Sequence, residues 1–490
     1  KFKPTCDLAA PSANVRNLHT LAGRHVQPSA YDKALELPAG IESGQGKRVF
    51  LLLLPFRKSG RSYPLDTAGW HDKLISPHMA GFQELAGDGD SYALAASDMR
   101  QSVQRRIPYP QLPGSTEPGL LGMDLLRLTL ERAATADEGL DILIALLERY
   151  GQSGRASATR DMTYHNSFII ADGRGGWIVQ TAGRHWVAKR IQGWASISNV
   201  YSIGSDYDRI SAHAADFATQ SGWHDPAADA PFDFATQSGW HDPAADAPFD
   251  FAAAYADPEF PALPGCVARF ALSQAQLTSL EERGKISLEE VFAVLRSHGA
   301  GDADAGWRLG ADGESVLCMH ARSPEGFETA ASMVAELPRP EKPDEPLLFW
   351  ASLASPCMST FVPVWPGAET PRAWMQPEDG AFDAWWEQES MQRLIERDYG
   401  RYAKAPRALF AELEADTLAA VRALSADAAK AVRAELTSDI IVRQQEARGI
   451  ISRMTEACAC KVLSRQPDLR GSYLQQVDAT RPQTFRAVAA

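Results

Sequence analysis

The residue with the clearest potential for chemistry is a cysteine near the start of the numbered chain. Cys6 follows Lys1–Thr5 and stands in the stretch Thr-Cys-Asp-Leu-Ala-Ala-Pro. If Lys1–Thr5 were removed, Cys6 would carry a thiol with a pKa near ~8.5 and a free α-amine with a pKa near ~7.7–8.0. One residue would then hold a nucleophile and a base matched to neutral pH, which suits hydrolysis of an amide bond. Taken alone, such a cysteine is far more often an inert or packed side chain.

Composition limits the kind of partner that the chain can have. Its 490 residues include 49 Lys and Arg against 62 Asp and Glu, a net charge of −13, and 45% of them are hydrophobic. This charge argues against nucleic acid or an anionic membrane as the main partner. No apolar run approaches the ~20 residues of a membrane helix, and Lys1–Pro4 lacks the apolar stretch of a signal peptide. We therefore expect a cytoplasmic protein with a sizeable core.

The cysteines predict neither disulfides nor a metal centre. Six cysteines over this length are too sparse for a disulfide framework. Cys458 and Cys460 form a close pair, but no second pair matches them, so zinc is not expected. No cofactor of any other kind is expected either.

Residues 217–233 recur identically as residues 234–250. Two copies are too few for a repeat architecture, and lengthening a surface loop costs little free energy. We therefore interpret 217–250 as a duplicated surface loop. The paired His224 and His241 in the two copies are not expected to bind a metal.

Hydrophobic periodicity predicts strands, then helices, then strands, then helices. Strands are expected at 49–54, 92–96, 167–172, 176–182, 185–190, 195–198, 315–319, 329–336 and 347–352. Helices are expected within 117–150, at 286–298, from 385 onwards, and at 406–423, 425–436 and 438–461. Thr135 and Glu138 form a capping box for the second helix of 117–150, and Gly151 ends it. This order is typical of an α+β fold with antiparallel sheets and helices on their faces.

A set of short phrases occurs in a characteristic order along most of the chain, from Cys6 to about Tyr402. The phrases are Gly122–Arg132, Leu147–Gln152, His165–Asp172, Trp177–Ala188, Ile197–Asn199, Ser221–Trp223, Thr329–Val334 and Ala384–Trp386. As an ordered set they resemble the secernin and dipeptidase A-type peptidases, a branch of the N-terminal-nucleophile (Ntn) cysteine hydrolases.

The resemblance implies a four-layer αββα Ntn-hydrolase sandwich with antiparallel sheets, to which this chain adds a helical C-terminal extension. Residues 1–5 would be a removable propeptide, 6–370 the Ntn-hydrolase domain and 371–490 the helical C-terminal region. A homodimer through that helical region is compatible with its Ala-rich helices.

The resemblance also implies hydrolysis of a small peptide or amide substrate. Cys6 would be the nucleophile and its α-amine the proton shuttle. Asn199 closes the predicted strand 195–198, and related hydrolases use an asparagine at the matching place to hold the oxyanion. Arg269 matches an active-site arginine of those hydrolases, where a guanidinium could lower the pKa of the thiol or bind a carboxylate.

Three further residues are candidates for substrate binding. His165 and Asn166 precede a predicted strand, and His25 lies in Gly23–Pro28, where the family usually reads Gly-Lys-Asn-Ser. The family's Asn-Glu-His-Gly loop is replaced here by residues 88–91. These departures leave open a catalytically silent scaffold or binding protein of the same fold. A processed terminus that carries an α-carbonyl group is a third possibility that the resemblance allows.

Overall fold

The structure is a computed structural model, and it describes a defined part of the chain. The described residues are 50–53, 56–58, 93–98, 119–120, 122–130, 132–152, 165–225, 249–256, 264–283, 286–299, 317–320, 327–329, 331–337, 347–365, 384–396, 399–425 and 428–462. Cys6, His25 and the middle of the duplicated stretch 217–250 lie outside the described residues.

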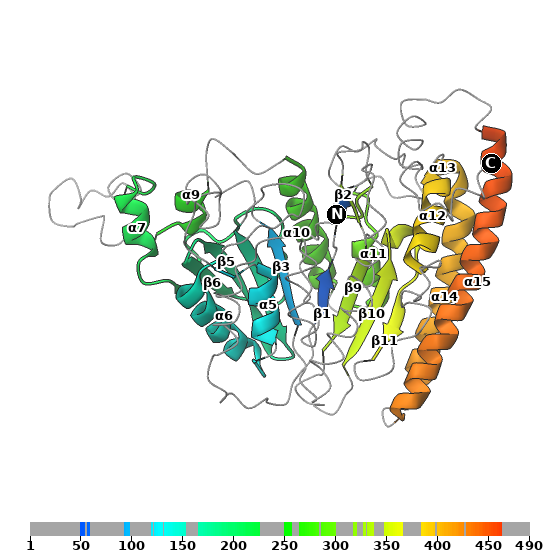
Figure 1. Cartoon of the computed structure of the whole chain (residues 1–490), viewed down its shortest axis with the longest axis horizontal. Helices are drawn as coiled ribbons and strands as arrows, with labels where there is room; N and C mark the ends of the chain where they lie inside the picture. The colour runs from blue at the N-terminus through cyan, green and yellow to red at the C-terminus, as the bar shows by residue number, and fades with distance from the viewer. Residues whose placement is uncertain are drawn as a thin grey trace.

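Two antiparallel sheets occupy the centre of the described chain (Figure 1). The first has the order β3-β4-β5-β6-β7, with β3 (Ala93–Asp98), β4 (Asn166–Asp172), β5 (Gly175–Ala182), β6 (His185–Arg190) and β7 (Arg209–Ile210). The second has the order β1-β9-β10-β11, with β1 (Phe50–Leu53), β9 (Ala331–Glu336), β10 (Leu348–Leu353) and β11 (Val362–Val364). A separate pair joins β2 (Phe56–Lys58) to β8 (Phe327–Thr329). The α+β class expected from the sequence is confirmed.

Helices lie beside both sheets and fill the C-terminal part of the chain. They are α5 (Gly122–Leu130), α6 (Ala136–Tyr150), α7 (Ala214–Gln220), α9 (Phe251–Tyr255), α10 (Pro264–Glu282), α11 (Leu288–Leu295), η5 (Pro356–Met358, a 3₁₀ turn), α12 (Ala384–Glu396), α13 (Tyr399–Tyr402), α14 (Lys404–Ala423) and α15 (Lys430–Val462). The predicted ends of α6 are confirmed, because the Thr135 side chain accepts from the Glu138 N–H and Gly151 ends the helix with φ +69°.

The two sides of β4 face different cores, since successive side chains of a strand point to opposite faces. Phe168 and Ile170 are fully buried in a cluster with Leu143 of α6. Ile169, between them, belongs to a second cluster with Met333 of β9. Each large apolar side chain buried in this way contributes ~1.5–3 kcal/mol. The first sheet is therefore held by helices on one side and by residues of the second sheet on the other.

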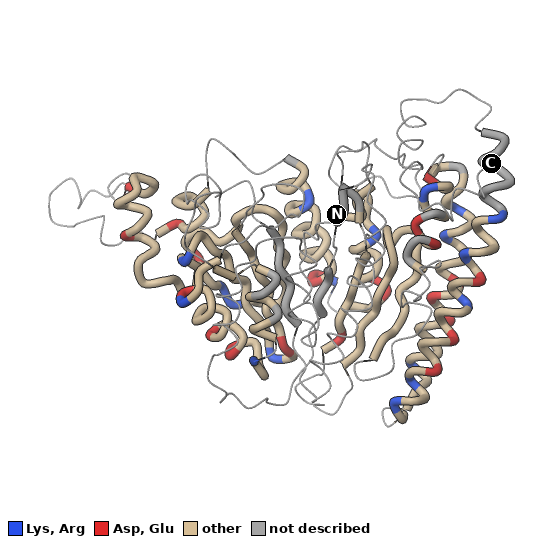
Figure 2. The backbone as a smooth tube through the Cα atoms, viewed as in Figure 1, with Lys and Arg blue, Asp and Glu red and all other residues tan. Residues whose placement is uncertain are grey.

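The second sheet has its own helical cover. Trp350 of β10 packs with Phe292 of α11, and Phe292 stacks on Phe361 with ring centroids 4.0 Å apart. Leu418 of α14 joins the same cluster. The long helix α15 runs along the outer side of α12 and α14 in Figure 1, and charges of both signs are interspersed along it in Figure 2. None of the helices in the described part of the chain combines the length and apolarity needed to cross a membrane.

Three local predictions were wrong. Residues 195–198 are not paired in a sheet, and the first sheet instead ends with β7. The described part of 315–319 bends at Leu317 and Cys318. The break expected between 436 and 438 does not occur: α15 continues through Thr437, whose hydroxyl lies 2.9 Å from the Pro363 carbonyl and 3.0 Å from the Arg433 carbonyl. Helix α10 was not predicted at all.

Candidate active site

Two of the residues proposed for catalysis, 70 positions apart in sequence, meet in the structure. Arg269 Nη2 lies 3.4 Å from Asn199 Oδ1 and donates to it. Arg269 is buried, with 9% of its surface exposed, whereas Asn199 is half-buried. An asparagine that accepts through Oδ1 presents its two remaining donors on Nδ2. The pair therefore combines a fixed positive charge with an oriented amide donor.

A network of side chains holds the segment before Asn199 against α10. Ser273 Oγ donates to Ser196 Oγ at 2.9 Å, and Ser198 Oγ donates to the carbonyl of Cys266 at 3.1 Å. Gly193, with φ +71°, turns the chain away from β6 at the start of this segment. These bonds replace the strand pairing expected for 195–198, and they explain why Asn199 is aligned with α10 rather than with the edge of a sheet.

A cysteine that the sequence analysis did not consider lies between the two. Arg269 Nη2 lies 3.2 Å from Cys266 Sγ, and Cys266 Sγ lies 3.9 Å from Asn199 Oδ1. Cys266 carries a buried thiol, 8% exposed. Its three-residue spacing to Arg269 places both on one side of α10. The sequence analysis did not predict this helix, so the spacing gave no signal.

His165 and Asn166 also lie together, in a network that is fully buried. The Gly183 N–H donates to His165 Nδ1 at 3.0 Å, and Asn166 Nδ2 donates to Gln152 Oε1 at 2.8 Å. Thr181 Oγ1 donates to the Asn166 carbonyl at 2.7 Å. A Cβ at Gly122 would collide with the Asn166 side chain. These contacts fix the start of β4, and a role in binding substrate stays a prediction.

One glutamine connects this network to the segment that carries Asn199. Gln180 of β5 stands opposite Ser167 and lies 3.5 Å from its hydroxyl. Its Nε2 donates to the Val200 carbonyl at 3.3 Å, and its Oε1 accepts from the Ser202 N–H at 2.9 Å. The residue after Asn199 is thus tied to the first sheet. Cys6 and His25, the other predicted site residues, lie outside the described residues.

A second group of reactive side chains lies between the second sheet and the C-terminal helices. One imidazole nitrogen or cysteine sulfur from each of His298, Cys318, His320 and Cys357 lies within 4.8 Å of the other three, and all four residues are buried. His320 Nδ1 lies 2.7 Å from Glu396 Oε1. Among the described residues this is the one group that could hold a metal ion.

Proton affinities in this second group are strongly shifted. Burial alone would lower the pKa of His320, but the Cys357 sulfur and the Glu396 carboxylate outweigh it and raise that pKa to about 10. Burial would raise the pKa of Cys357, yet hydrogen bonding from Cys318 and the two imidazoles hold it well below the usual range. Without a metal, the group therefore favours a thiolate beside an imidazolium.

Comparison with known protein families gives one match. The sequence model described as "Peptidase family C69" matches residues 108–411, more than half of the chain. The matched range contains Asn199, Arg269 and all four residues of the second group.

Proposed function

Because the chain belongs to peptidase family C69, which includes dipeptidase A and secernin-type cysteine peptidases, we propose that it hydrolyses a small peptide or amide with Cys6 as nucleophile. The observation that carries the proposal is the contact between Asn199 and Arg269, two residues that the sequence resemblance assigns to the site. Removal of Lys1–Thr5 would create the free α-amine that the mechanism needs.

The proposed reaction has two stages. The α-amine of Cys6 takes the thiol proton, and the thiolate attacks the substrate carbonyl to form a tetrahedral oxyanion. Collapse of this intermediate breaks the C–N bond, and the α-ammonium protonates the leaving amine. Water then attacks the thioester, passing a proton to the α-amine, and releases the acid and the thiol. No separate histidine base is required.

Asn199 and Arg269 would serve the charged species of this cycle. With Oδ1 held by Arg269, Asn199 would donate from Nδ2 to the oxyanion, an interaction that grows as charge develops on the oxygen. The Arg269 guanidinium would favour the thiolate of Cys6 or bind the terminal carboxylate of a dipeptide. Both roles need a donor that is fixed before substrate arrives, and the bonds between α10 and residues 196–198 supply that rigidity.

The proposal includes the four-layer αββα arrangement of the Ntn hydrolases. It is supported by the clusters on the two sides of β4, where Ile170 packs with α6 and Ile169 packs with Met333 of the second sheet. Trp350, on the opposite side of the second sheet, packs with α11.

Hydrolysis of a panel of unblocked dipeptides by the purified protein tests the proposal. Wild type should release free amino acids, and Cys6→Ala should abolish the release. Cys6→Ser should keep a small residual rate, because a hydroxyl at residue 6 is a weaker nucleophile. Activity that survives in Cys6→Ala but disappears in Cys357→Ala or Cys266→Ala would place the nucleophile elsewhere and refute the assignment.

The alternative, a catalytically silent scaffold, has one observation in its favour. Three of the five exposed large hydrophobic side chains among the described residues, Val432, Val442 and Ile450, lie on α15. They would suit the homodimer expected through the helical C-terminal region. Sedimentation of wild type and of the double variant Val432→Glu/Ile450→Glu tests this alternative. It predicts that wild type is a dimer, that the double variant is a monomer, and that neither protein hydrolyses dipeptides.

A further inference from the structure

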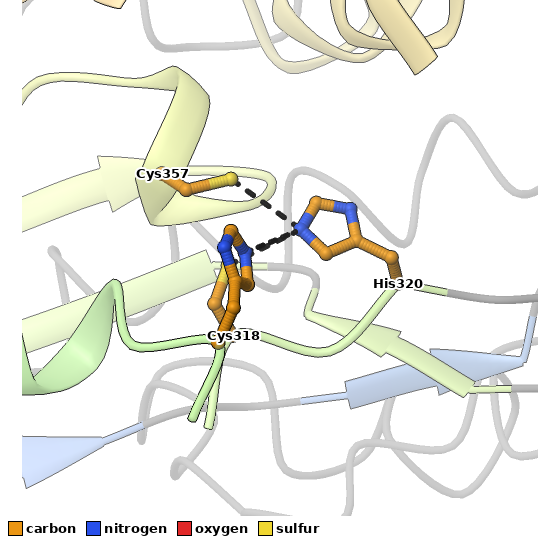
Figure 3. A group of neighbouring side chains, drawn as sticks. Cys318, His320 and Cys357 are labelled. Atoms are coloured by element: carbon orange, nitrogen blue, oxygen red, sulfur yellow. Dashed lines mark hydrogen bonds between the residues drawn. The ribbon is translucent and has the colours of Figure 1, made fainter. Parts of the chain in front are cut away.

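We propose that His298, Cys318, His320 and Cys357 bind one Zn²⁺ ion in a structural site. The four residues come from three separate segments: the turn after α11, the stretch 317–320, and η5. In Figure 3, the Cys357 sulfur points at the ring of His320, and Cys318 lies beside them on another part of the fold. Convergence of two thiols and two imidazoles on one point is the donor set that zinc prefers.

The distances from His320 Nε2 to the other three donor atoms match the edges of a zinc tetrahedron. With Zn–N near ~2.05 Å and Zn–S near ~2.3 Å, two nitrogens lie about 3.3 Å apart and a nitrogen and a sulfur about 3.6 Å apart. His298 Nε2 lies 3.1 Å from His320 Nε2. Cys318 Sγ and Cys357 Sγ lie 3.5 Å and 3.3 Å from the same nitrogen. Three edges of the tetrahedron therefore already have the length that one shared ion needs, and all four donor atoms lie within 4.8 Å of one another.

Burial and charge favour a closed structural site over a catalytic one. The exposed fractions are 3% for His298, 0% for Cys318, 9% for His320 and 5% for Cys357. Four protein ligands complete a tetrahedron and leave no position for substrate. Two thiolates neutralise the two charges of Zn²⁺, so the loaded centre is neutral, which an interior tolerates far better than an isolated ion.

Residues around the ligands orient them as in known zinc sites. His320 Nδ1 donates to Glu396 Oε1 at 2.7 Å, which turns Nε2 towards the other three ligands. Glu396 is fixed in turn by Gln392 Nε2, at 2.8 Å. Gln392 also accepts from the Ser355 N–H at 3.0 Å, two residues before Cys357. Carboxylate, histidine and cysteine are thus linked through α12.

The backbone that carries the ligands is held from both sides. The Ser297 carbonyl accepts from the N–H groups of Leu317 and Cys318, each at 3.0 Å, so the segment with His298 is tied to the segment with His320. The Met319 N–H donates to Thr329 Oγ1 at 2.9 Å. Ala354, close to Cys357, has φ +54°, a conformation that costs free energy for a residue with a Cβ. A bound ion would offset that cost.

Two other readings fit part of this geometry. Cys357, His320 and Glu396 are arranged like the nucleophile, base and orienting carboxylate of a catalytic triad. A triad needs access for substrate, however, and it gives His298 no role. A disulfide between Cys318 and Cys357 would leave both imidazoles without a ligand role. Only the metal uses all four side chains.

The test begins with the wild-type protein purified without chelator. Elemental analysis should find about one zinc per chain, and native mass spectrometry should show the added mass of the ion. After chelation, Co²⁺ should give the intense visible bands of a tetrahedral site together with thiolate charge-transfer bands. If wild type contains no zinc and shows no tetrahedral Co²⁺ spectrum after Co²⁺ is added, the proposal is overturned, irrespective of the results for the variants.

Variants then locate the ion. Cys318→Ser and Cys357→Ser should each lower zinc content at least about tenfold, and Glu396→Gln should weaken affinity about 10–100-fold while retaining the ligands. Cys458→Ser/Cys460→Ser and the exposed His213→Gln are the controls and should keep the full content. Loss of zinc only in the Cys458/Cys460 control would contradict this site.

Thiol chemistry separates the remaining readings. With zinc bound, Cys318 and Cys357 should resist iodoacetamide in the folded protein, and both should react after chelation and unfolding without reductant. A Cys318–Cys357 disulfide found in the native protein would refute the metal site, as would rapid alkylation of Cys357 alone with loss of hydrolysis.

Discussion

An ion pair between α14 and the end of α11 supplies a prediction with a calculable magnitude. Arg296 Nη1 and Nη2 donate to the two oxygens of Glu414 at 2.7 and 2.6 Å, and the Phe361 N–H donates to Glu414 Oε2 at 3.0 Å. Arg296 also donates to the carbonyls of Pro356 and Ser359. The carboxylate therefore joins three parts of the chain, and Glu414→Ala removes all three bonds at once.

The expected loss follows from what remains buried. Removing one partner of a buried ion pair costs ~3–5 kcal/mol. The Arg296 side chain is 23% exposed and that of Glu414 8%, so water screens part of the orphaned charge and about 3 kcal/mol is expected. The Phe361 N–H, left without its acceptor, adds about 1 kcal/mol. Glu414→Ala should therefore lower the free energy of unfolding by about 4 kcal/mol, and Glu414→Gln by about half as much.

Urea unfolding followed by near-ultraviolet circular dichroism measures this loss, because the pair adjoins the aromatic cluster of Phe292 and Phe361. The matched control is Glu412→Ala, an exposed glutamate on the same helix, which should shift the free energy by less than ~0.5 kcal/mol. A loss in Glu414→Ala no larger than in the control would refute the reasoning. Recovery of stability in Arg296→Met/Glu414→Leu would identify the orphaned charge as the cause.

Three further outcomes are expected. Asn199→Ala should lower kcat for dipeptide hydrolysis ~10²–10³-fold with KM little changed, because the lost donor acts mainly on the oxyanion; an equal rise in KM with kcat intact would contradict that role. Burial, and then His213, lower the pKa of His185 below its unfolded value near ~6.5. The folded state therefore binds fewer protons than the unfolded state, so the free energy of unfolding is highest above the unfolded pKa and falls as pH drops towards the folded pKa. In urea melts between pH 7.5 and 5, His185→Gln should make the free energy of unfolding less dependent on pH. Arg448, fully buried and paired with Glu387 at 3.0 Å, should tolerate Glu387→Gln poorly, with a loss of ~3–5 kcal/mol in the same assay.

Local chemistry in the sequence was enough to predict the regular elements. The N-cap at Thr135, the stop at Gly151 and the alternation along β4 to β6 each follow from a few neighbouring residues, and the structure confirms them. The other half of the predicted capping box differs, because the Glu138 carboxylate accepts from the Ala134 N–H instead of the Thr135 N–H. Residues 195–198 share that alternation, but Ser196 and Ser198 bond to α10 instead of to a strand. A distant helix decided their conformation, and no local pattern could show it.

The candidate sites show the same limit. Asn199 and Arg269 were assigned through the resemblance, and their contact is a property of the fold. The group of His298 and Cys357 was missed because 58 residues separate these two in sequence, so no short motif contains all four ligands. One signal was present: Cys318 and His320 lie two positions apart, and their side chains meet in the structure.

The most direct test of the hydrolase proposal is the intact mass of the mature protein, taken before and after brief treatment with iodoacetamide. The account predicts a chain that begins at Cys6 and gains one acetamide group there, with hydrolysis lost in step with the labelling. A chain that keeps Lys1–Thr5, with an unlabelled Cys6 and undiminished hydrolysis, would contradict it.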